Sequence, residues 1–388
     1  MEARVHDQSQ IYVEILAPDP THSRNDWTGV VGVQLLSCPS QQIRDLSVQE
    51  NSSFSQTEQV DLINAIHTLK PTTSYALRCI TRPNQASFSA GKVDVCVFGQ
   101  TNAENRESAY NQAIELVFQL IMQLGGTFPN YKWRVITDPQ VFSEFIHPFD
   151  WSTANVVELR RREELVELDK VNPTRGVGFV KDSHPVKASS NEPVYYVHPF
   201  VPRPGRFERL LRIMLLHKFP IAFTTIITPT SLLPEEERYL LDSITTCEGF
   251  RAPTSKDLAR IQEQRALLLS KGILDQMLRL QDAPFYTTIA LASPQKIPAS
   301  ICEAAGVAIS APVGEGLNPI SVEPLLLQKG GYDVVQPESD QDWQTARQNQ
   351  EFLTQGNWGK SISPENAHRL RFLLDGYEAS SAFRFPKD

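Results

Sequence analysis

The sequence predicts a mixed α/β (α+β) fold, in which two lobes of mixed sheet are covered by helices and contain ferredoxin-like elements. Runs of β-branched and aromatic residues alternate along the chain with runs whose apolar residues recur every three or four positions. Hairpin patterns occur among the strand-like runs, which disfavours a purely parallel sheet. The length of 388 residues is enough for two or three domains.

The expected N-terminal lobe covers residues 1–150 and begins with strands. Four apolar and β-branched runs are predicted strands: residues 11–16, 30–36, 74–80 and 92–98. The last two form a hairpin, because Pro83, Asn84 and Gly91 lie between them. The Ser- and Gln-rich residues 37–60 are interpreted as a long, mobile connection.

A helix is expected after the hairpin. Its apolar residues fall on one face at spacings of three and four: Tyr110, Ala113, Ile114, Val117, Ile121 and Leu124. Asn102 is the predicted N-cap, and Gly125 and Gly126 are expected to end the helix. Residues 131–137 form the next strand, and the order strand-strand-helix-strand is half of a ferredoxin-like unit.

Residues 151–192 are expected to be a charged segment followed by a linker. The periodicity of residues 155–169 fits a charged strand or a helix and does not decide between them. Residues 171–192 hold several Pro and Gly residues and a Ser/Asn run, so they are interpreted as a loop at the domain boundary.

The expected C-terminal lobe covers residues 193–388 and ends in helices. Its predicted strands are residues 194–200, 221–228, 285–292 and 332–335. Its predicted helices are residues 207–215, 234–249 and 255–281, a short helix after Pro298, and helices near 338–353 and 364–375. Residues 221–228 are almost all apolar or β-branched, as expected for a strand buried on both faces.

Composition limits the classes of partner and compartment. Lys and Arg number 37 against 45 Asp and Glu, a net charge of −8, so any DNA contact is expected to be a local patch. Five scattered cysteines fit neither a disulfide framework nor a metal knuckle. We expect a cytoplasmic protein, because neither a signal peptide nor an apolar run of about 20 residues that could span a bilayer is visible.

No catalytic, cofactor-binding or metal-ligating residue is predicted. The sequence Gly356-Asn-Trp-Gly359-Lys360-Ser361 approaches a P-loop, but Thr354 stands at the first glycine position and Trp358 would crowd a phosphate cradle. The eight histidines include no H-x-x-x-H or H-E-x-x-H pair. Residues 167–170 (ELDK) resemble a nuclease carboxylate-and-lysine pattern whose spacing is one residue out. No cofactor is therefore predicted.

Three consecutive arginines form the sharpest local charge feature: Arg160, Arg161 and Arg162. Such a cluster could grip phosphates of DNA, or of a neighbouring subunit's nucleotide, through bidentate contacts. The alternative, which we favour, is that four nearby glutamates neutralise it: Glu158, Glu163, Glu164 and Glu167.

Six segments, taken in order, resemble a known family. They are residues 76–100, 158–164, 195–202, 229–249, 281–294 and the ending 379–386 (ASSAFRFP). Together they are similar to the N-terminal region of large bacterial ATP-binding proteins related to HerA, FtsK and the conjugative type IV secretion ATPases. In that family an α/β region precedes a RecA-like motor domain. The resemblance implies that Phe383, Arg384, Phe385 and Pro386 are the junction with the motor.

The resemblance implies a non-catalytic N-terminal or accessory region of a DNA-translocase ATPase. Its role would be oligomerisation and partner docking, through self-association or a motor ATPase subunit. The sequence has neither Walker A nor Walker B, so ATP hydrolysis is expected only if a motor domain completes the chain. The alternatives are a free-standing adaptor unrelated to ATPases and an enzyme with an unrecognised active site.

Overall fold

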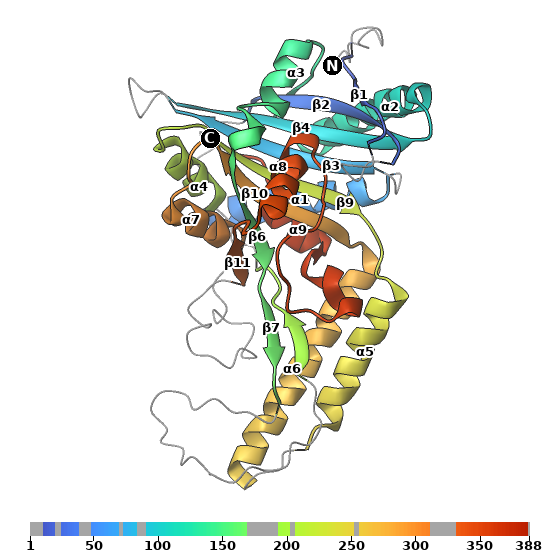
Figure 1. The fold of residues 1–388 in the computed structure, drawn as a ribbon, viewed down its shortest axis with the longest axis vertical. Coiled ribbons are helices and arrows are strands. Elements are labelled where there is room, and N and C mark those ends of the chain that lie inside the picture. The colour runs from blue at the N-terminus through green and yellow to red at the C-terminus, as the bar shows by residue number, and fades with distance from the viewer. Residues whose placement is uncertain are drawn as a thin grey trace.

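The protein consists of a wide twisted sheet, with helices on both faces, and a narrow arm that projects from it (Figure 1). This computed structural model describes the following residues: 11–19, 25–38, 48–69, 73–83, 91–168, 193–201, 206–251, 256–310 and 331–386. The predicted mixed α/β class is confirmed. No helix of the described ranges is long and apolar enough to cross a membrane.

The large sheet contains ten strands in the described ranges, and all of its pairings are antiparallel. Its main path runs β1 (Glu14–Leu16), β2 (Trp27–Ser37), β4 (Lys92–Ala103), β3 (Thr73–Arg82), β9 (Ile221–Pro229), β10 (Phe285–Ser293), β6 (Asn155–Arg161) and β11 (Tyr332–Val335). Beside this path, β5 (Lys132–Val135) pairs with β2, and β12 (Leu373–Leu374) pairs with β10.

One face of the sheet carries the main hydrophobic core. The helices that pack on it are α1 (Val48–His67), α2 (Arg106–Thr127), α4 (Arg206–Leu215), α7 (Ala299–Ile309) and α9 (Gly376–Ala382). Strand side chains alternate between faces, so Tyr75, Leu77 and Cys79 of β3 point into this core. Where α2 crosses β2, a Cβ on Gly29 would lie 2.5 Å from the Ala109 carbonyl oxygen, so this approach needs glycine.

The opposite face is covered by α3 (Pro139–Ile146) and α8 (Asp340–Phe352). Arg78 of β3 points to this side and is fully buried. Its guanidinium donates to the carbonyl oxygens of Phe145 (3.0 Å) and Ile146 (2.9 Å), and it also donates to the Gln350 carbonyl. Burial lowers the pKa of Arg78 to about 9. Arg78 thus fastens both covering helices to the middle of the sheet.

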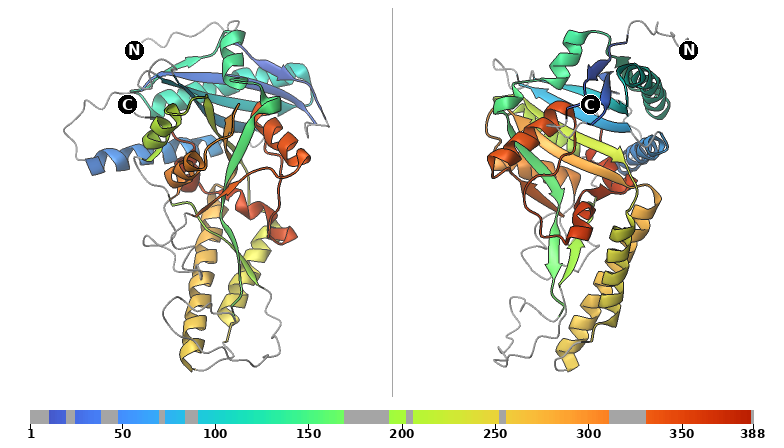
Figure 2. Two further views of the ribbon diagram at one scale, coloured as in Figure 1. Left: turned by 60° about the vertical axis from the view of Figure 1, so that its left-hand side comes forward. Right: turned by 45° about the vertical axis from the view of Figure 1, so that its right-hand side comes forward.

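The arm has a hydrophobic core of its own. It is built from the short antiparallel pair β7 (Glu163–Val166) and β8 (Val194–Val197) and from the helices α5 (Pro234–Gly249) and α6 (Lys256–Asp282). Figure 2 shows the two helices extending well beyond the sheet. Strand β9 leads into α5, and α6 returns the chain to β10, so the helical part of the arm is an insertion between two adjacent strands.

The predicted lobe boundaries need correction. Strand β3 pairs with β9 from Tyr75 opposite Ile227 to Thr81 opposite Ile221, so residues 1–150 and 193–388 contribute to one continuous sheet. In the segment 151–192, expected to be a charged segment followed by a linker, the charged part contains β6, which lies inside the sheet between β10 and β11. The second lobe is instead the arm, whose core is separate from those of the sheet.

Some local predictions also differ from the structure. The part of residues 37–60 that the structure describes from Val48 onward is helical, as the first turns of α1. The N-cap of α2 is Asn105, whose side chain accepts from the Ser108 amide, rather than Asn102. The undecided residues 155–169 form β6 and β7, and the helix expected near 364–375 is a 3₁₀ helix, η5 (Glu365–Arg371), followed by β12.

Candidate functional site

The three consecutive arginines lie at the end of β6, where the arm joins the sheet. All three are buried, with exposed fractions of 5%, 1% and 8% in sequence order. They belong to a group of four arginines and four carboxylates, the arginine–carboxylate cluster: Glu158, Arg160, Arg161, Arg162, Glu163, Asp333, Arg371 and Glu378. The formal charges of these eight groups balance.

Arg160 pairs with a carboxylate on its own strand. Its Nε and Nη2 donate to Glu158 Oε2 at 2.8 and 2.7 Å. Its Nη1 donates to the Trp358 carbonyl at 3.0 Å, and its guanidinium lies 4.1 Å from the centre of the Trp358 ring and 5.3 Å from that of Phe372. Burial raises the pKa of Glu158, although the Arg160 charge opposes this shift.

Arg161 points to the face of the sheet opposite to that of Arg160, and it binds mainly backbone carbonyls. It donates to those of Leu373 (2.5 Å), Leu370 (3.3 Å) and His198 (3.2 Å). Its Nε lies 3.7 Å from Glu378 Oε2. Burial raises the pKa of Glu378 to about 7, against the opposing charge of Arg161. Arg161 therefore ties the sheet to the segment between η5 and α9.

Arg162 and Arg371 share one carboxylate. Arg162 Nε donates to Asp333 Oδ1 at 3.1 Å, and its Nη2 donates to the Tyr332 carbonyl at 2.7 Å. Arg371 Nη2 donates to Asp333 Oδ2 at 3.1 Å, and its Nη1 donates to Glu163 Oε1 at 2.8 Å. These contacts join β11, η5 and the first residue of the arm.

The surroundings of the three arginines discriminate between a phosphate contact and neutralisation by nearby glutamates. A contact with phosphate needs donors that face solvent, and these three side chains point into the protein. Among the four glutamates expected to neutralise them, Glu158 binds Arg160, whereas Glu163 binds Arg371 and Glu164 binds His198. The cluster is suited to joining chain segments rather than to gripping an exposed phosphate.

The glycine-containing loop after α8 does not form a phosphate cradle. Trp358 is buried, and its Nε1 donates to Glu158 Oε1 at 2.7 Å. The Gly359 amide donates to Asp342 Oδ1 at 2.9 Å, and the exposed Lys360 Nζ lies 3.1 Å from Glu338 Oε2. An amide and an ammonium group that would meet phosphate oxygens are thus occupied by carboxylates of this chain.

Other chemistry is limited in the described part of the chain. No group of three or more His, Cys, Asp and Glu side chains there could hold a metal ion. Of the nuclease-like residues 167–170, Asp169 and Lys170 lie outside the described residues.

A surface hollow of about 460 Å³ lies where α5 begins against η5. It is lined by Leu233, Glu235, Glu236, Glu365, Asn366, His368 and Arg369.

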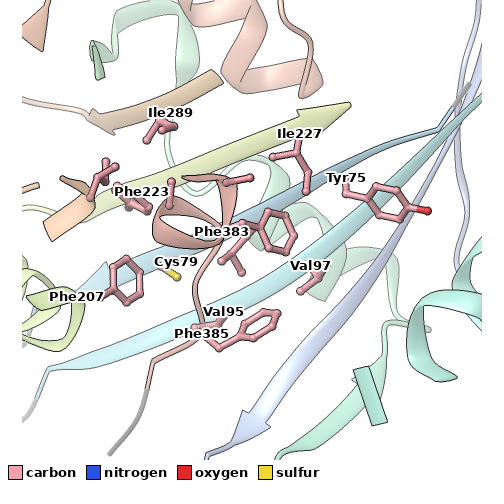
Figure 3. Close-up of a cluster of buried hydrophobic side chains, with 14 of the residues drawn as sticks. Tyr75, Cys79, Val95, Val97, Phe207, Phe223, Ile227, Ile289, Phe383 and Phe385 are labelled. Carbon is pink, nitrogen blue, oxygen red and sulfur yellow. The ribbon is translucent and has the colours of Figure 1, made fainter. Parts of the chain in front are cut away.

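The predicted motor junction directly follows α9 and enters the main core. Phe383 and Phe385 are 1% and 0% exposed. The ring of Phe385 lies 5.1 Å from that of Phe128 and 5.0 Å from that of Trp133, both in edge-on geometry. Figure 3 shows Phe383 and Phe385 among side chains of β3, β4, β9 and α4.

Polar contacts hold the same segment at both ends. The Thr225 hydroxyl of β9 donates to the Ala382 carbonyl at 2.9 Å, and the Tyr131 hydroxyl donates to the Pro386 carbonyl at 3.4 Å. Arg384 between the two aromatic residues is buried, and burial lowers its pKa. The junction residues are therefore a fixed part of the fold.

The arm presents apolar side chains to solvent. On α6, Leu267, Leu268, Leu274 and Leu278 have exposed fractions of 56%, 41%, 39% and 56%. Leu241 of α5 is also exposed. Exposed apolar groups gathered on a projecting element are typical of a protein–protein contact. The sequence analysis did not predict this surface, although the heptad spacing of its leucines is visible in the sequence.

Comparison with known proteins identified no relative of this chain. No protein-family model matches the chain, and the search of curated proteins gave no match.

Proposed function

We propose that this chain is a non-catalytic N-terminal or accessory region of a HerA/FtsK-like DNA-translocase ATPase. In this proposal it assembles the motor and docks its partners, and the motor domain that hydrolyses ATP lies elsewhere, on the same polypeptide or on a partner chain. The substrate, DNA, would be handled by that motor.

The observation that carries the proposal is the anchoring of the junction. The segment that resembles the entry to the motor domain is packed between β9 and α2, with Phe385 completely buried. A motor attached after this segment would be joined to residues that are packed in the main core. Force or rotation in the motor would therefore be transmitted to the sheet, as an assembly platform requires.

The arm supports the docking half of the proposal. It projects from the sheet (Figure 2), and its helix α6 carries exposed leucines. The arginine–carboxylate cluster binds the base of the arm to the segment that leads into the junction, through Arg161, Arg371 and Glu378. A partner bound by the arm would thus be mechanically connected to the motor.

Two measurements test this proposal. First, the purified chain with Mg²⁺ and ATP should show the same negligible phosphate release as its Lys360→Ala variant. Second, a motor with Walker A should be encoded in the continuation of this reading frame or beside it, and this motor should bind the chain. ATP turnover that is lost in Lys360→Ala would overturn the proposal, and so would a motor that shows no binding.

A further inference from the structure

Helix α6 has two apolar faces, and the arm uses only one of them. The inner face holds Ala266, Leu269, Ile273, Met277 and Leu280, which are buried against α5 and β8. The outer face holds Leu267, Leu274 and Leu278, with Lys271 in the same row. Their spacings of four, three and four residues are those of a coiled-coil seam. The outer row is therefore arranged to receive another helix.

The charges on this row discriminate between possible occupants. In a parallel pair of identical helices Lys271 would face its own copy across the seam, which is unfavourable for two ammonium groups. In an antiparallel pair about an axis between residues 272 and 273, Leu267 faces Leu278 of the second copy. Lys271 then faces Leu274 of the second copy and lies beside Asp275 of that copy, which is exposed although it also pairs with Arg279 of its own helix at 3.4 Å. Each copy supplies both the lysine and the aspartate.

We propose that α6 is a self-association surface, through which two copies of this chain pair antiparallel along the row Leu267, Lys271, Leu274 and Leu278. The partner is a second copy because the row is complementary to itself when reversed, in leucine position and in charge. The purpose of this pairing, the assembly of the motor, rests on the proposed function. The arm projects from the sheet (Figure 1), so antiparallel arms would direct the two sheets toward opposite ends of the dimer.

The first test is the mass of the full chain by sedimentation equilibrium over a range of concentrations. The wild type should form dimers, and Leu274→Glu/Leu278→Glu should raise the dimer dissociation constant about 100-fold or more. Leu216→Glu is the matched control, because Leu216 is 61% exposed and lies outside the arm. This control should leave the dissociation constant unchanged, and thermal melts should show that all variants are folded. An unchanged dimer in the double variant, or a wild type that stays monomeric, overturns the inference.

The second test is a charge exchange that also reports the direction of pairing. Lys271→Glu and Asp275→Lys should each weaken the dimer, because each creates like charges across the interface. The double variant Lys271→Glu/Asp275→Lys should recover most of the wild-type affinity. Additive losses would exclude the antiparallel register. Motor binding reports separately on the proposed function, because a monomeric arm variant that still binds the motor would leave that function intact.

Discussion

Arg161 on β6 and Glu378 on α9 face each other inside the protein, with Nε and Oε2 3.7 Å apart and both side chains almost completely buried. The other oxygen of Glu378 lies 3.6 Å from Nη1 of Arg279, on the arm helix α6. The sheet, the arm and the C-terminal helix therefore meet at one carboxylate. This contact is the structural basis for the expected coupling between the arm and the junction.

The first prediction concerns pH. Burial raises the pKa of Glu378 to about 7 in the folded protein, above its ordinary value of about 4.5. The stabilisation that this group provides is therefore complete below about pH 4.5 and is lost as the pH rises through about 7. The variant Glu378→Gln has no carboxyl group to ionise, so it does not lose this stability as the pH rises. Its unfolding free energy relative to the wild type should rise with pH, by at most about 1.4 kcal/mol per pH unit in that window.

Urea unfolding at several pH values between 4.5 and 8 measures this difference. Parallel profiles for the wild type and Glu378→Gln would show that Glu378 titrates in the folded protein as it does in the unfolded chain.

The second prediction concerns the arginine–carboxylate cluster. Arg160→Met leaves Glu158 buried without its cation, which should lower the unfolding free energy by about 3–5 kcal/mol. Lys360→Ala removes an ion pair that is exposed on both sides and should change it by less than about 1 kcal/mol. Chemical denaturation compares the two variants. Equal effects would mean that the Arg160 pair behaves as a surface pair.

The third prediction separates structure from DNA contact at the same arginines. Because the Arg162 side chain lies inside the protein, paired with Asp333, Arg162→Gln should reduce stability and leave DNA affinity unchanged. Anisotropy titrations at two salt concentrations test this on the folded variant. A salt slope that is lower by about one in the variant would assign Arg162 to a phosphate contact.

The fourth prediction concerns the junction. Phe385→Ala should lower the unfolding free energy by about 3–5 kcal/mol, because it opens a cavity beside Phe128 and Trp133. Tyr377→Ala on α9 is the matched control, since Tyr377 is 47% exposed, and should cost about 1 kcal/mol or less. Thermal and urea unfolding measure both. A small effect at Phe385 would contradict the description of the junction as part of the core.

The sequence predicted those elements whose formation depends on local pattern. Residues 221–228 were identified as a buried strand because almost every side chain is apolar or β-branched, and β9 is indeed an interior strand. The hairpin of β3 and β4 followed from the turn residues between its strands. Helix α1 was missed because its first turns are rich in Ser and Gln. Its apolar residues Leu62, Ile63 and Ile66 pack in the main core, which also includes side chains of α9.

Long-range pairing could not be predicted from these patterns. The glutamates next to the arginines were visible, but Arg162 pairs with Asp333, 171 residues away. The pairing of β3 with β9, which merges the two expected lobes, likewise joins residues about 150 positions apart. Neither contact has a local sequence signature, because each depends on how the strands are ordered in the sheet.

Sedimentation velocity on a mixture of this chain and the proposed Walker A motor, produced as a separate protein, tests the central claim most directly. Our account predicts a single faster boundary that contains both proteins and saturates as the motor is added. Two boundaries that migrate independently at every concentration would contradict it.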